Sequence, residues 1–328
     1  MKQEKINIIL PAKIGDTVLA IPYLICLKEL QAKYRSNDLD ITIYTSNELK
    51  DVFDAYGLNR IKYLGISEKI KSWFFKADKA FFLFTSTKNL GFKAKKTYGE
   101  FNTFKKYLKY DVNTPFLNYV YLKKDMPVEL YNFLETDKKL CPCSVRYFGT
   151  LLDMGFTIEQ IIETFEFSKD KLIKIQEYSN FSIELFNKKY LVFCMEAASN
   201  AARDADRRWN QDYYIELAER AYAQFGFECA FIGINKTYKI TDKPYFHDFR
   251  GDLSVADSTK LMEKSVGYVG NDTGPLHLAN LMLRPAVAIY SRKNTLTEYN
   301  PLVAELVQQL YNPQSIEEVY EKMVKVWG

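Results

Sequence analysis

A group of residues able to bind an anion follows an apolar run near residue 270: Asp272, Thr273, Gly274 and His277. The run SVGYVG is typical of a buried strand and GPLHLANLML is typical of a helix, so NDTG is a strand-to-helix loop. Gly274 permits a tight turn, Pro275 suits a first helical position, and the N–H groups at a helix start attract anions. We therefore expect a phosphate near Thr273 and His277, with Asp272 accepting from sugar hydroxyls. A plain helix cap is the alternative.

A second polar loop follows the apolar run YLVFCM. It carries Arg203, Arg207 and Arg208 shortly before a helical pattern over DYYIELAERAYAQFG. Because guanidinium groups bind a diphosphate through a fixed fork of donors, this loop indicates a diphosphate site. The alternative is a solvated basic face that pairs with the neighbouring aspartates.

A carboxylate stands after the first apolar run, INIIL, in the stretch PAKIGDTVLAIP. Gly15 permits a tight turn, and Asp16 begins a long helical pattern that reaches Tyr34. Asp16 is then either an N-cap or a carboxylate that takes a proton from an incoming hydroxyl.

These loops need strands and helices to position them, and the sequence supplies two alternating sets. The first set starts with INIIL and DITIYT, and the second starts with YLVFCM and ECAFIG. Such alternation predicts two doubly wound α/β halves with parallel sheets. We expect domains at residues 1–180 and 181–314, a closing helix at 315–328, and a ligand in the cleft between the domains.

The composition narrows the class of protein. The 328 residues are 47% hydrophobic, and 45 basic against 41 acidic residues leave a net charge of +4, which does not favour nucleic acid as a partner. Apolar runs are too short for a signal peptide or a membrane span, and five scattered cysteines fit a reducing compartment. We expect a cytoplasmic protein in which CPC at 141–143 is a free-thiol loop and not a zinc site.

Together the three loops resemble glycosyltransferase family 9, the bacterial lipopolysaccharide heptosyltransferases. The matching stretches, in order, are KIGDTVLAIP, RRWNQDYYIELAE and DTGPLHLANLMLRPAVAIY, and VRYFGTLLDMGF is similar to a mid-chain family segment. The resemblance implies a GT-B fold, with two Rossmann-like domains, the acceptor on the first and the nucleotide-sugar on the second. It also implies that the closing helix crosses back onto the first domain.

The resemblance further implies roles for single residues in an inverting, metal-independent transfer of heptose from ADP-heptose. Asp16 matches the general base, and Arg207 stands where the family has a Lys that holds the donor diphosphate. Thr273, Gly274 and His277 match the phosphate loop, and Asp272 matches the contact to the donor sugar. The chain departs from the family in NAARDADRR, where Ser199 is the nearest hydroxyl, and in INKTYK, which lacks an acidic ribose contact.

The acceptor of the family is an anionic Kdo-containing lipopolysaccharide core. The basic and aromatic segment KAKKTYGEFNTFKKYLKY, with Lys95 and Lys96, suits such an acceptor or the surface of the inner membrane. A solvated basic helix with aromatics packed inward is the alternative. Lys13 and Arg146 are further candidate acceptor contacts.

The leading hypothesis is therefore a heptosyltransferase that acts at the cytoplasmic face of the inner membrane, without a cofactor or metal. A transferase with a protein or another glycan as acceptor, a nucleotide-sugar epimerase of the same fold, and an inactive binding module are the alternatives.

Overall fold

The computed structural model describes residues 3–11, 13–35, 38–46, 49, 53, 61–63, 66–83, 94–99, 116–118, 126–165, 179, 181–197, 208–234, 236–291 and 300–328. The chain divides into two compact units, Met1–Phe167 and Ser168–Gly328, here called the first and second units. The boundary lies before the one expected near residue 180.

The first unit is built on a six-stranded parallel sheet in the order β3-β2-β1-β4-β5-β6. Its strands are β1 (Glu4–Ile9), β2 (Leu39–Thr45), β3 (Ile61–Tyr63), β4 (Ala77–Phe82), β5 (Ala94–Gly99) and β6 (Phe116–Asn118). The β-branched and aromatic residues of the central strands, such as Ile6, Ile8 and Phe81, are fully buried, as the apolar runs predicted.

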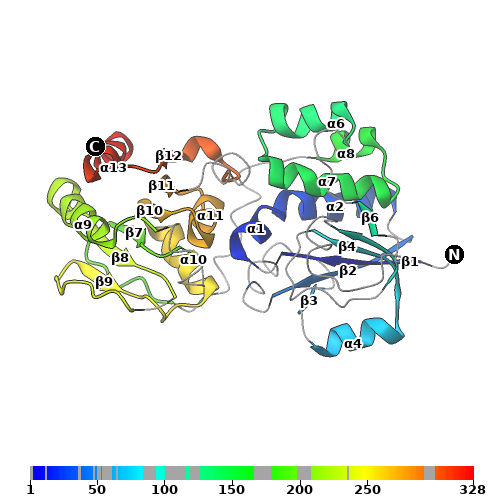
Figure 1. Cartoon of the computed structure of the whole chain (residues 1–328), viewed down its shortest axis with the longest axis horizontal. Coiled ribbons are helices and arrows are strands. Elements are labelled where there is room, and N and C mark those ends of the chain that lie inside the picture. Colours follow the sequence, from blue (N-terminus) through cyan, green and yellow to red (C-terminus); the bar gives the residue numbers. More distant parts are fainter. Residues whose placement is uncertain are drawn as a thin grey trace. The chain divides into compact units, whose positions relative to one another are not determined.

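Helices lie on both faces of this sheet. They are α1 (Ile14–Val18), α2 (Ile21–Tyr34), α4 (Ile66–Phe74), α6 (Val128–Asn132), the π-helical turn η3 (Phe133–Asp137), α7 (Pro142–Asp153) and α8 (Ile158–Thr164). Helices α2, α6, α7 and α8 gather on one side of the sheet, while α4 lies on the other (Figure 1). Tyr23 of α2 packs edge-on against Phe148 of α7, which closes the core on the first side.

The second unit repeats the same plan. Its parallel sheet runs β12-β11-β10-β7-β8-β9, with β7 (Tyr190–Cys194), β8 (Glu228–Phe231), β9 (Phe246–Asp248), β10 (Gly267–Asn271), β11 (Ala286–Tyr290) and β12 (Val307–Tyr311). Its helices are α9 (Gln211–Phe225), α10 (Val255–Lys264), α11 (Gly274–Leu281), the short 3₁₀ turn η7 (Ala304–Leu306) and α13 (Ile316–Trp327).

Both sheets have the same strand order when each is numbered from its own first strand, 3-2-1-4-5-6. This is the strand order of the dinucleotide-binding fold. Strands 1 to 3 extend the sheet to one side and strands 4 to 6 extend it to the other, so the strand order reverses between strands 1 and 4; this point, here called the chain reversal, leaves a crevice at the carboxyl ends of the two strands. The reversal falls between β1 and β4 in the first unit and between β7 and β10 in the second. The doubly wound α/β prediction is thus confirmed for each unit.

The closing helix packs inside the second unit. Ile316, Val319 and Met323 of α13 are buried in the core around β7, β10 and β11, and the Trp327 indole donates to the Val266 carbonyl at 3.1 Å. Its apolar face is therefore used within its own unit. The expected passage of this helix onto the first domain stays a prediction.

One local expectation was wrong. CPC is not a loop, because Cys141 is the N-cap of α7 and Pro142 and Cys143 form its first turn. For the segment with Lys95 and Lys96, the alternative of a basic helix does not hold at 94–99, where the chain forms the strand β5, paired in parallel with β4. Pairing with a strand distant in the chain gives β5 its conformation, which local composition did not show.

Candidate functional site

Asp16 lies directly beyond the carboxyl end of β1, at the chain reversal of the first unit. It is the third residue of α1, whose N-cap is Lys13 in an extended conformation and without a side-chain capping bond. The Thr17 hydroxyl donates to the Pro11 carbonyl at 2.8 Å and holds the loop against the strand end. Asp16 is thus not the N-cap, and its half-buried carboxylate belongs to the first turn of α1.

Two hydroxyl groups of helix α7 bond to the main chain of α1 and its C-cap. The Tyr147 hydroxyl donates to the Asp16 carbonyl at 3.4 Å, and the Ser144 hydroxyl donates to the Leu19 carbonyl at 2.8 Å. Burial raises the pKa of the Cys143 thiol well above its usual value, and the charges of Cys141 and Asp16 raise it further while Arg146 lowers it. Asp16 and Arg146 therefore act on the same buried thiol, which brings two of the predicted site residues into one neighbourhood.

At the chain reversal of the second unit, Asn271 joins the two loops that the sequence singled out. It is 1% exposed at the end of β10, and its amide nitrogen donates to the carbonyls of Met195 at 2.9 Å and Glu196 at 3.3 Å. Its oxygen accepts from the Trp209 backbone N–H at 3.3 Å and the Tyr214 hydroxyl at 2.9 Å. One buried amide thus fixes the described residues on both sides of the arginine loop to the start of the NDTG loop.

The NDTG loop leads from β10 into α11, as expected. Thr273 is the N-cap of α11 but makes no side-chain capping bond; its hydroxyl donates to the Asn271 carbonyl at 3.3 Å. The simple capping alternative therefore does not account for Thr273. Asp272 and His277 are both buried, at 8% and 5% exposure, so two polar side chains are held inside the helix start. The eight-residue helix α11 offers its positive N-terminal end beside them.

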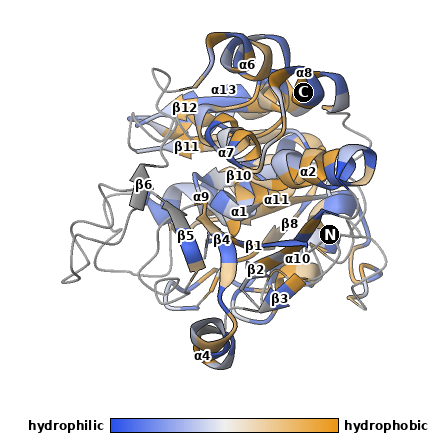
Figure 2. Ribbon diagram, turned by 90° about the vertical axis from the view of Figure 1, so that its right-hand side faces the viewer, coloured by the Kyte–Doolittle hydropathy of each residue, from blue (hydrophilic) through white to orange (hydrophobic). Residues whose placement is uncertain are grey.

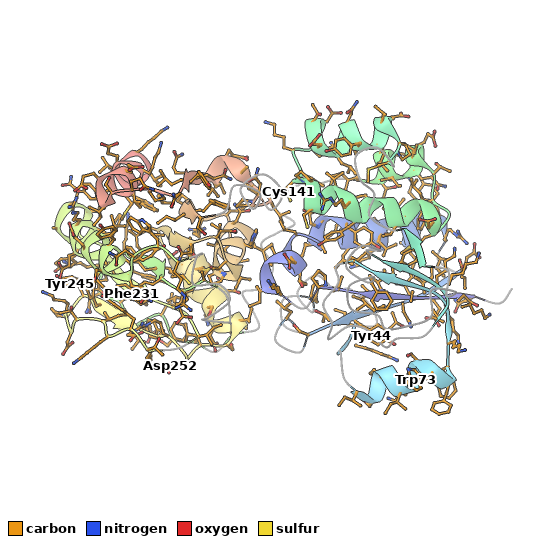
Figure 3. All side chains as sticks on the ribbon, in the orientation of Figure 1. Tyr44, Trp73, Cys141, Phe231, Tyr245 and Asp252 are labelled. Carbon is orange, nitrogen blue, oxygen red and sulfur yellow. The ribbon has the colours of Figure 1, made fainter. Side chains whose placement is uncertain are left out.

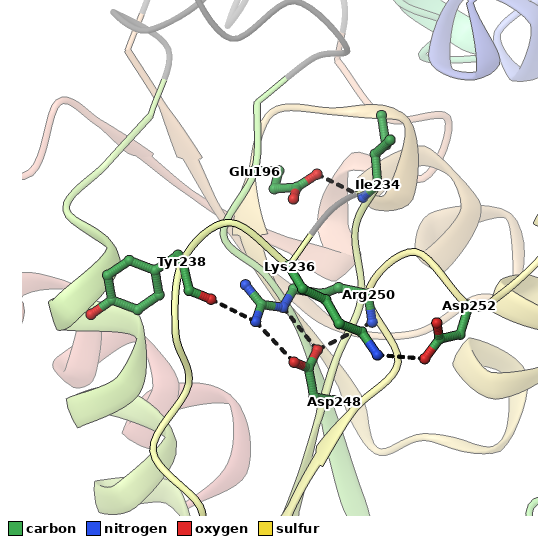
Figure 4. Close-up of polar contacts among 7 residues, drawn as sticks. All are labelled: Glu196, Ile234, Lys236, Tyr238, Asp248, Arg250 and Asp252. Atoms are coloured by element: carbon green, nitrogen blue, oxygen red, sulfur yellow. Dashed lines mark hydrogen bonds and ion pairs between the residues drawn. The ribbon is translucent and has the colours of Figure 1, made fainter.

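A buried carboxylate, Glu196, lies at the end of β7 and was missed in the sequence. It is 9% exposed and accepts from the Ile234 N–H at 2.7 Å (Figure 4). A Cβ at Gly233 would stand 2.8 Å from the Glu196 carboxyl carbon, so glycine is what allows this approach. The start of the loop after β8, where the sequence INKTYK has no acidic residue, thus receives a carboxylate from the neighbouring strand end. The only signal in the sequence is an acid directly after a buried strand.

Beside this loop, Arg250 forms an almost fully buried ion pair. Its guanidinium is 2% exposed and donates to both carboxylate oxygens of Asp248, at 2.8 and 2.9 Å, and to the Tyr238 carbonyl at 2.8 Å (Figure 4). Partial burial alone would raise the pKa of Asp248, but the hydrogen bonds and charge of Arg250 outweigh it and hold that pKa below its usual value. The pair shapes the loop between β8 and β9.

A comparison with protein families matches residues 145–325 to glycosyltransferase family 9 (heptosyltransferase). That match spans more than half of the chain. The chain belongs to glycosyltransferase family 9. This family 9 protein is accordingly a glycosyltransferase, and the family resemblance found in its motifs is confirmed.

Solved structures place the whole chain of this family 9 enzyme in the GT-B fold. It is similar to the ADP-heptose lipopolysaccharide heptosyltransferase II of E. coli, with 18% identity, 98% of each chain covered and a TM-score of 0.63. It is also similar to the E. coli heptosyltransferase WaaC, solved with ADP, with 11% identity, 98% of this chain and 99% of that chain covered, and a TM-score of 0.60. A family 9 glycosyltransferase of Veillonella parvula has 16% identity, with 99% of this chain and 92% of that chain covered and a TM-score of 0.58. No curated protein matches the chain by sequence.

Those predicted site residues of this family 9 enzyme that the structure describes fall into three groups. Asp16, Lys13 and Arg146 lie in the first unit around α1 and the start of α7, and Asp272, Thr273, Gly274 and His277 lie around the start of α11. Arg207 and Ser199, as well as Arg203, lie outside the described residues.

Lys95 and Lys96 form the third group. They belong to the beginning of β5, where Lys96 is level with Lys79 of β4 and, through β4, with Ile6 of β1. Asp16 follows the opposite, carboxyl end of β1. The structure therefore does not bring the two lysines together with Asp16, and Lys95 instead pairs with Asp78 at 2.6 Å.

Proposed function

We propose that this family 9 enzyme transfers heptose from ADP-heptose to a lipopolysaccharide inner-core acceptor that contains Kdo or heptose. One observation carries the proposal: the two units place different functional groups at their chain reversals. A carboxylate follows β1 in the first unit, and a helix N-terminus with Thr273 and His277 follows β10 in the second. One E. coli relative of the same fold is named as an ADP-heptose heptosyltransferase, and another, the heptosyltransferase WaaC, was solved with ADP, which supports the choice of donor.

In the proposed reaction Asp16 is the general base. It takes the proton of the acceptor hydroxyl as that oxygen attacks the anomeric carbon, while the bond from this carbon to the diphosphate oxygen breaks. Attack opposite the leaving group inverts the configuration at the anomeric carbon. Lys13 and Arg146 contribute positive charge near Asp16, which suits an acceptor that carries carboxylates.

The second unit is proposed to hold the leaving ADP. The N-terminal end of α11, the Thr273 hydroxyl and His277 would stabilise negative charge that develops on the diphosphate, together with Arg207 and Ser199 of the arginine loop. Asp272 would accept from hydroxyls of the donor sugar, and Gly274 would allow the backbone to approach the phosphate. Because these groups can stabilise the charge of the leaving diphosphate, the reaction does not need a metal ion. We therefore propose a metal-independent transfer.

The setting we propose is the cytoplasmic face of the inner membrane. Within the described ranges, no helix has the length and apolar character needed to cross a bilayer. Contact with the membrane would then be peripheral, which brings the enzyme to a lipid-linked acceptor.

Calorimetric binding of ADP, GDP, UDP and dTDP, without metal and then with magnesium, is the experiment that tests this function. We expect a metal-independent preference for ADP, followed by transfer of heptose to a Kdo-lipid acceptor in a coupled assay. A preference for UDP or GDP would remove ADP-heptose as the donor. Binding of ADP without transfer to any core acceptor would instead point to a protein or another glycan as the acceptor.

A further inference from the structure

Strand β8 is the second strand of the second unit, and no acidic residue follows it directly. Its last three residues, Cys229 to Phe231, are hydrophobic and fully buried (Figure 2), and Phe231 can be located in Figure 3. The chain then continues as IGINKTYK, which holds no carboxylate. In the dinucleotide-binding fold, an Asp or Glu near the end of the second strand accepts a hydrogen bond from the ribose of the bound nucleotide. The sequence next to β8 offers no such group.

The carboxylate of Glu196 reaches this strand end from the neighbouring strand. Phe193 of β7 is level with Phe231 of β8, and Glu196 and Ile234 each follow three residues later. The Ile234 N–H donates to a Glu196 carboxylate oxygen at 2.7 Å (Figure 4). A Cβ atom at Gly233 would lie only 3.0 and 3.2 Å from the two carboxylate oxygens. The Glu196 carboxylate thus stands where a side chain of residue 233 would begin.

The turn beneath this carboxylate is held from both neighbouring strands. The Ile232 N–H donates to the Phe193 carbonyl of β7 at 2.9 Å, and the Gly251 N–H donates to the Gly233 carbonyl at 2.8 Å. The position of the Glu196 carboxylate over the turn therefore follows from strand pairing, and the turn presents it in a fixed place.

The main chain of Glu196 is also tied to the start of the NDTG loop. The Asn271 amide nitrogen donates to the Glu196 carbonyl at 3.3 Å, and Thr273, the N-cap of α11, follows two residues later. A ribose is joined to its diphosphate through a single carbon, so a ribose contact must lie close to the group that binds the phosphates. Glu196 meets this requirement, because β7 and β10 are adjacent strands of one sheet.

A carboxylate has more capacity than the bond to Ile234 uses. An ionised carboxylate only accepts hydrogen bonds and has about four lone-pair positions, so one bond to a backbone N–H does not exhaust it. Glu196 is 9% exposed, and burial of a charge costs free energy that an amide or hydroxyl oxygen bonded to the same N–H would not cost. A role that needs the charge, such as a strong bond to a ligand hydroxyl, accounts for the choice of residue.

We propose that Glu196 binds the ribose hydroxyls of the donor nucleotide and makes the second unit selective for ribonucleoside over deoxyribonucleoside diphosphates. The carboxylate accepts from a ribose hydroxyl, while the Ile234 N–H orients it. This inference rests on the proposed donor site at the chain reversal of the second unit. It depends neither on the base of the nucleotide nor on the sugar that is transferred.

The test is calorimetric binding of ADP, 2′-deoxy-ADP and 3′-deoxy-ADP to the full chain. We expect the parent to bind at least one deoxy analogue about tenfold more weakly than ADP, because that analogue lacks the hydroxyl that the carboxylate binds. In Glu196→Ala, ADP should bind about tenfold more weakly than in the parent, and the three nucleotides should differ by less than about twofold. A parent that binds all three equally well would overturn the proposal.

A purely structural role of Glu196 gives a different result. If the carboxylate only braced the turn, Glu196→Ala would weaken ADP and the deoxy analogues by the same factor, and their ratio would stay as in the parent. That outcome would also overturn the proposal. Glu196→Gln keeps an acceptor oxygen for the Ile234 N–H, so it carries the test if Glu196→Ala does not fold. Its preference for ADP over the deoxy analogue should be smaller than that of the parent, because the charge is lost.

Glu228→Ala is the matched control. Glu228 is a carboxylate of the same unit that is 5% exposed, and it bonds to the His247 ring at 2.8 Å at the opposite, amino end of β8. Its replacement should lower stability in urea unfolding but leave the affinity for ADP and the preference over deoxy analogues unchanged. An equal loss of this preference in Glu228→Ala would assign the effect to a general loosening of the unit and would contradict the proposal.

The same measurement with GDP, UDP and their 2′- and 3′-deoxy forms separates this inference from the proposed function. A parent that prefers GDP or UDP would remove ADP-heptose as the donor, while a ribose preference that disappears in Glu196→Ala would still support the role of Glu196. Conversely, heptose transfer from ADP-heptose by an enzyme with no ribose preference would support the proposed function and overturn the role of Glu196.

Discussion

The two units share one strand order but differ in how their sheets are covered. In the second unit every residue of the three central strands β7, β10 and β11 is buried, so both faces of the centre of the sheet are covered. In the first unit β2 alternates between buried and half-exposed residues over its first four positions, and α4 covers its polar face. The comparison teaches that topology fixes where loops lie, while side chains decide whether a face becomes core or surface.

The loops at the two chain reversals differ in a similar way. In the second unit the buried Asn271 amide ties the described residues on both sides of the arginine loop, Met195, Trp209 and Tyr214, to the start of the NDTG loop. In the first unit α1 is held by the Thr17 hydroxyl and by the Tyr147 hydroxyl of α7. Under the proposed function, the second unit binds the donor and the first unit carries the general base.

Replacement of the base is expected to have the largest effect. Asp16→Asn should lower heptose transfer by about a thousandfold, because the amide cannot accept the proton of the acceptor hydroxyl. Binding of ADP, measured by calorimetry, should be unchanged if base and donor site lie in different units. Glu129→Gln, an exposed carboxylate change in the same unit, should leave both intact. Transfer at near-parent rates by Asp16→Asn would refute its role as base.

Replacement of Asn271 is expected to have the second-largest effect. Asn271→Ala leaves buried partners unsatisfied, so we expect the free energy of unfolding to fall by about 3 kcal/mol and ADP binding to weaken. Denaturant unfolding and calorimetry measure the two effects.

Asn280→Ala is the control for this change, since Asn280 is equally buried and bonds to Val303 N and O, both at 2.9 Å. This variant should be less stable than the parent but should bind ADP with unchanged affinity. Equal losses of ADP affinity in both variants would mean that Asn271 has no special link to the donor loops.

The ion pair of Arg250 predicts a pH dependence of stability in the second unit. The pKa of Asp248 is held below its ordinary value, so the pair stabilises the fold above the pKa of the unfolded state, about 4. That stability is lost as pH falls through the lower, folded pKa.

Asp248→Asn should therefore unfold more easily at neutral pH, by about 2 kcal/mol, and lose less stability on acidification than the parent. Urea unfolding at several pH values measures both. Asp252→Asn breaks only an exposed pair with Lys236 and should stay within about 0.5 kcal/mol of the parent. If Asp248→Asn lost as much stability on acidification as the parent, the pair of Asp248 and Arg250 would not be the cause of the pH dependence.

The smallest effect is expected at the exposed apolar side chains of α4, such as Trp73, which is 57% exposed. Trp73→Ser should change the free energy of unfolding by less than about 0.5 kcal/mol, since the indole is exposed. Phe148→Ala, at a fully buried aromatic in the same unit, should cost about 3–5 kcal/mol. Thermal and urea unfolding compare the two variants, and a large loss of stability in Trp73→Ser would show that the Trp73 indole contributes to the fold.

Much of the fold could be predicted because its signals are local. INIIL, YLVFCM and SVGYVG became β1, β7 and β10, and the NDTG loop lies between β10 and α11 as its Gly-Pro pair indicated. The strand β5 could not be predicted, because its conformation depends on pairing with β4, which is distant in the chain. The start of α7 did carry a local signal, since Pro142 stands at the first helical position. Glu196 was missed for the same reason: nothing next to it in sequence shows that it reaches Ile234.

The sequence by itself determined the alternating strands and helices, the loops that carry Asp16 and the NDTG motif, and the family resemblance. These follow from residue spacing, since apolar periodicity and turn residues act over a few positions. Only the tertiary structure decided that Asn271 joins two loops, that Glu196 serves the loop after β8, and that α4 turns its apolar side outward. Each of these depends on side chains brought together by strand pairing and helix packing, which short-range pattern does not encode.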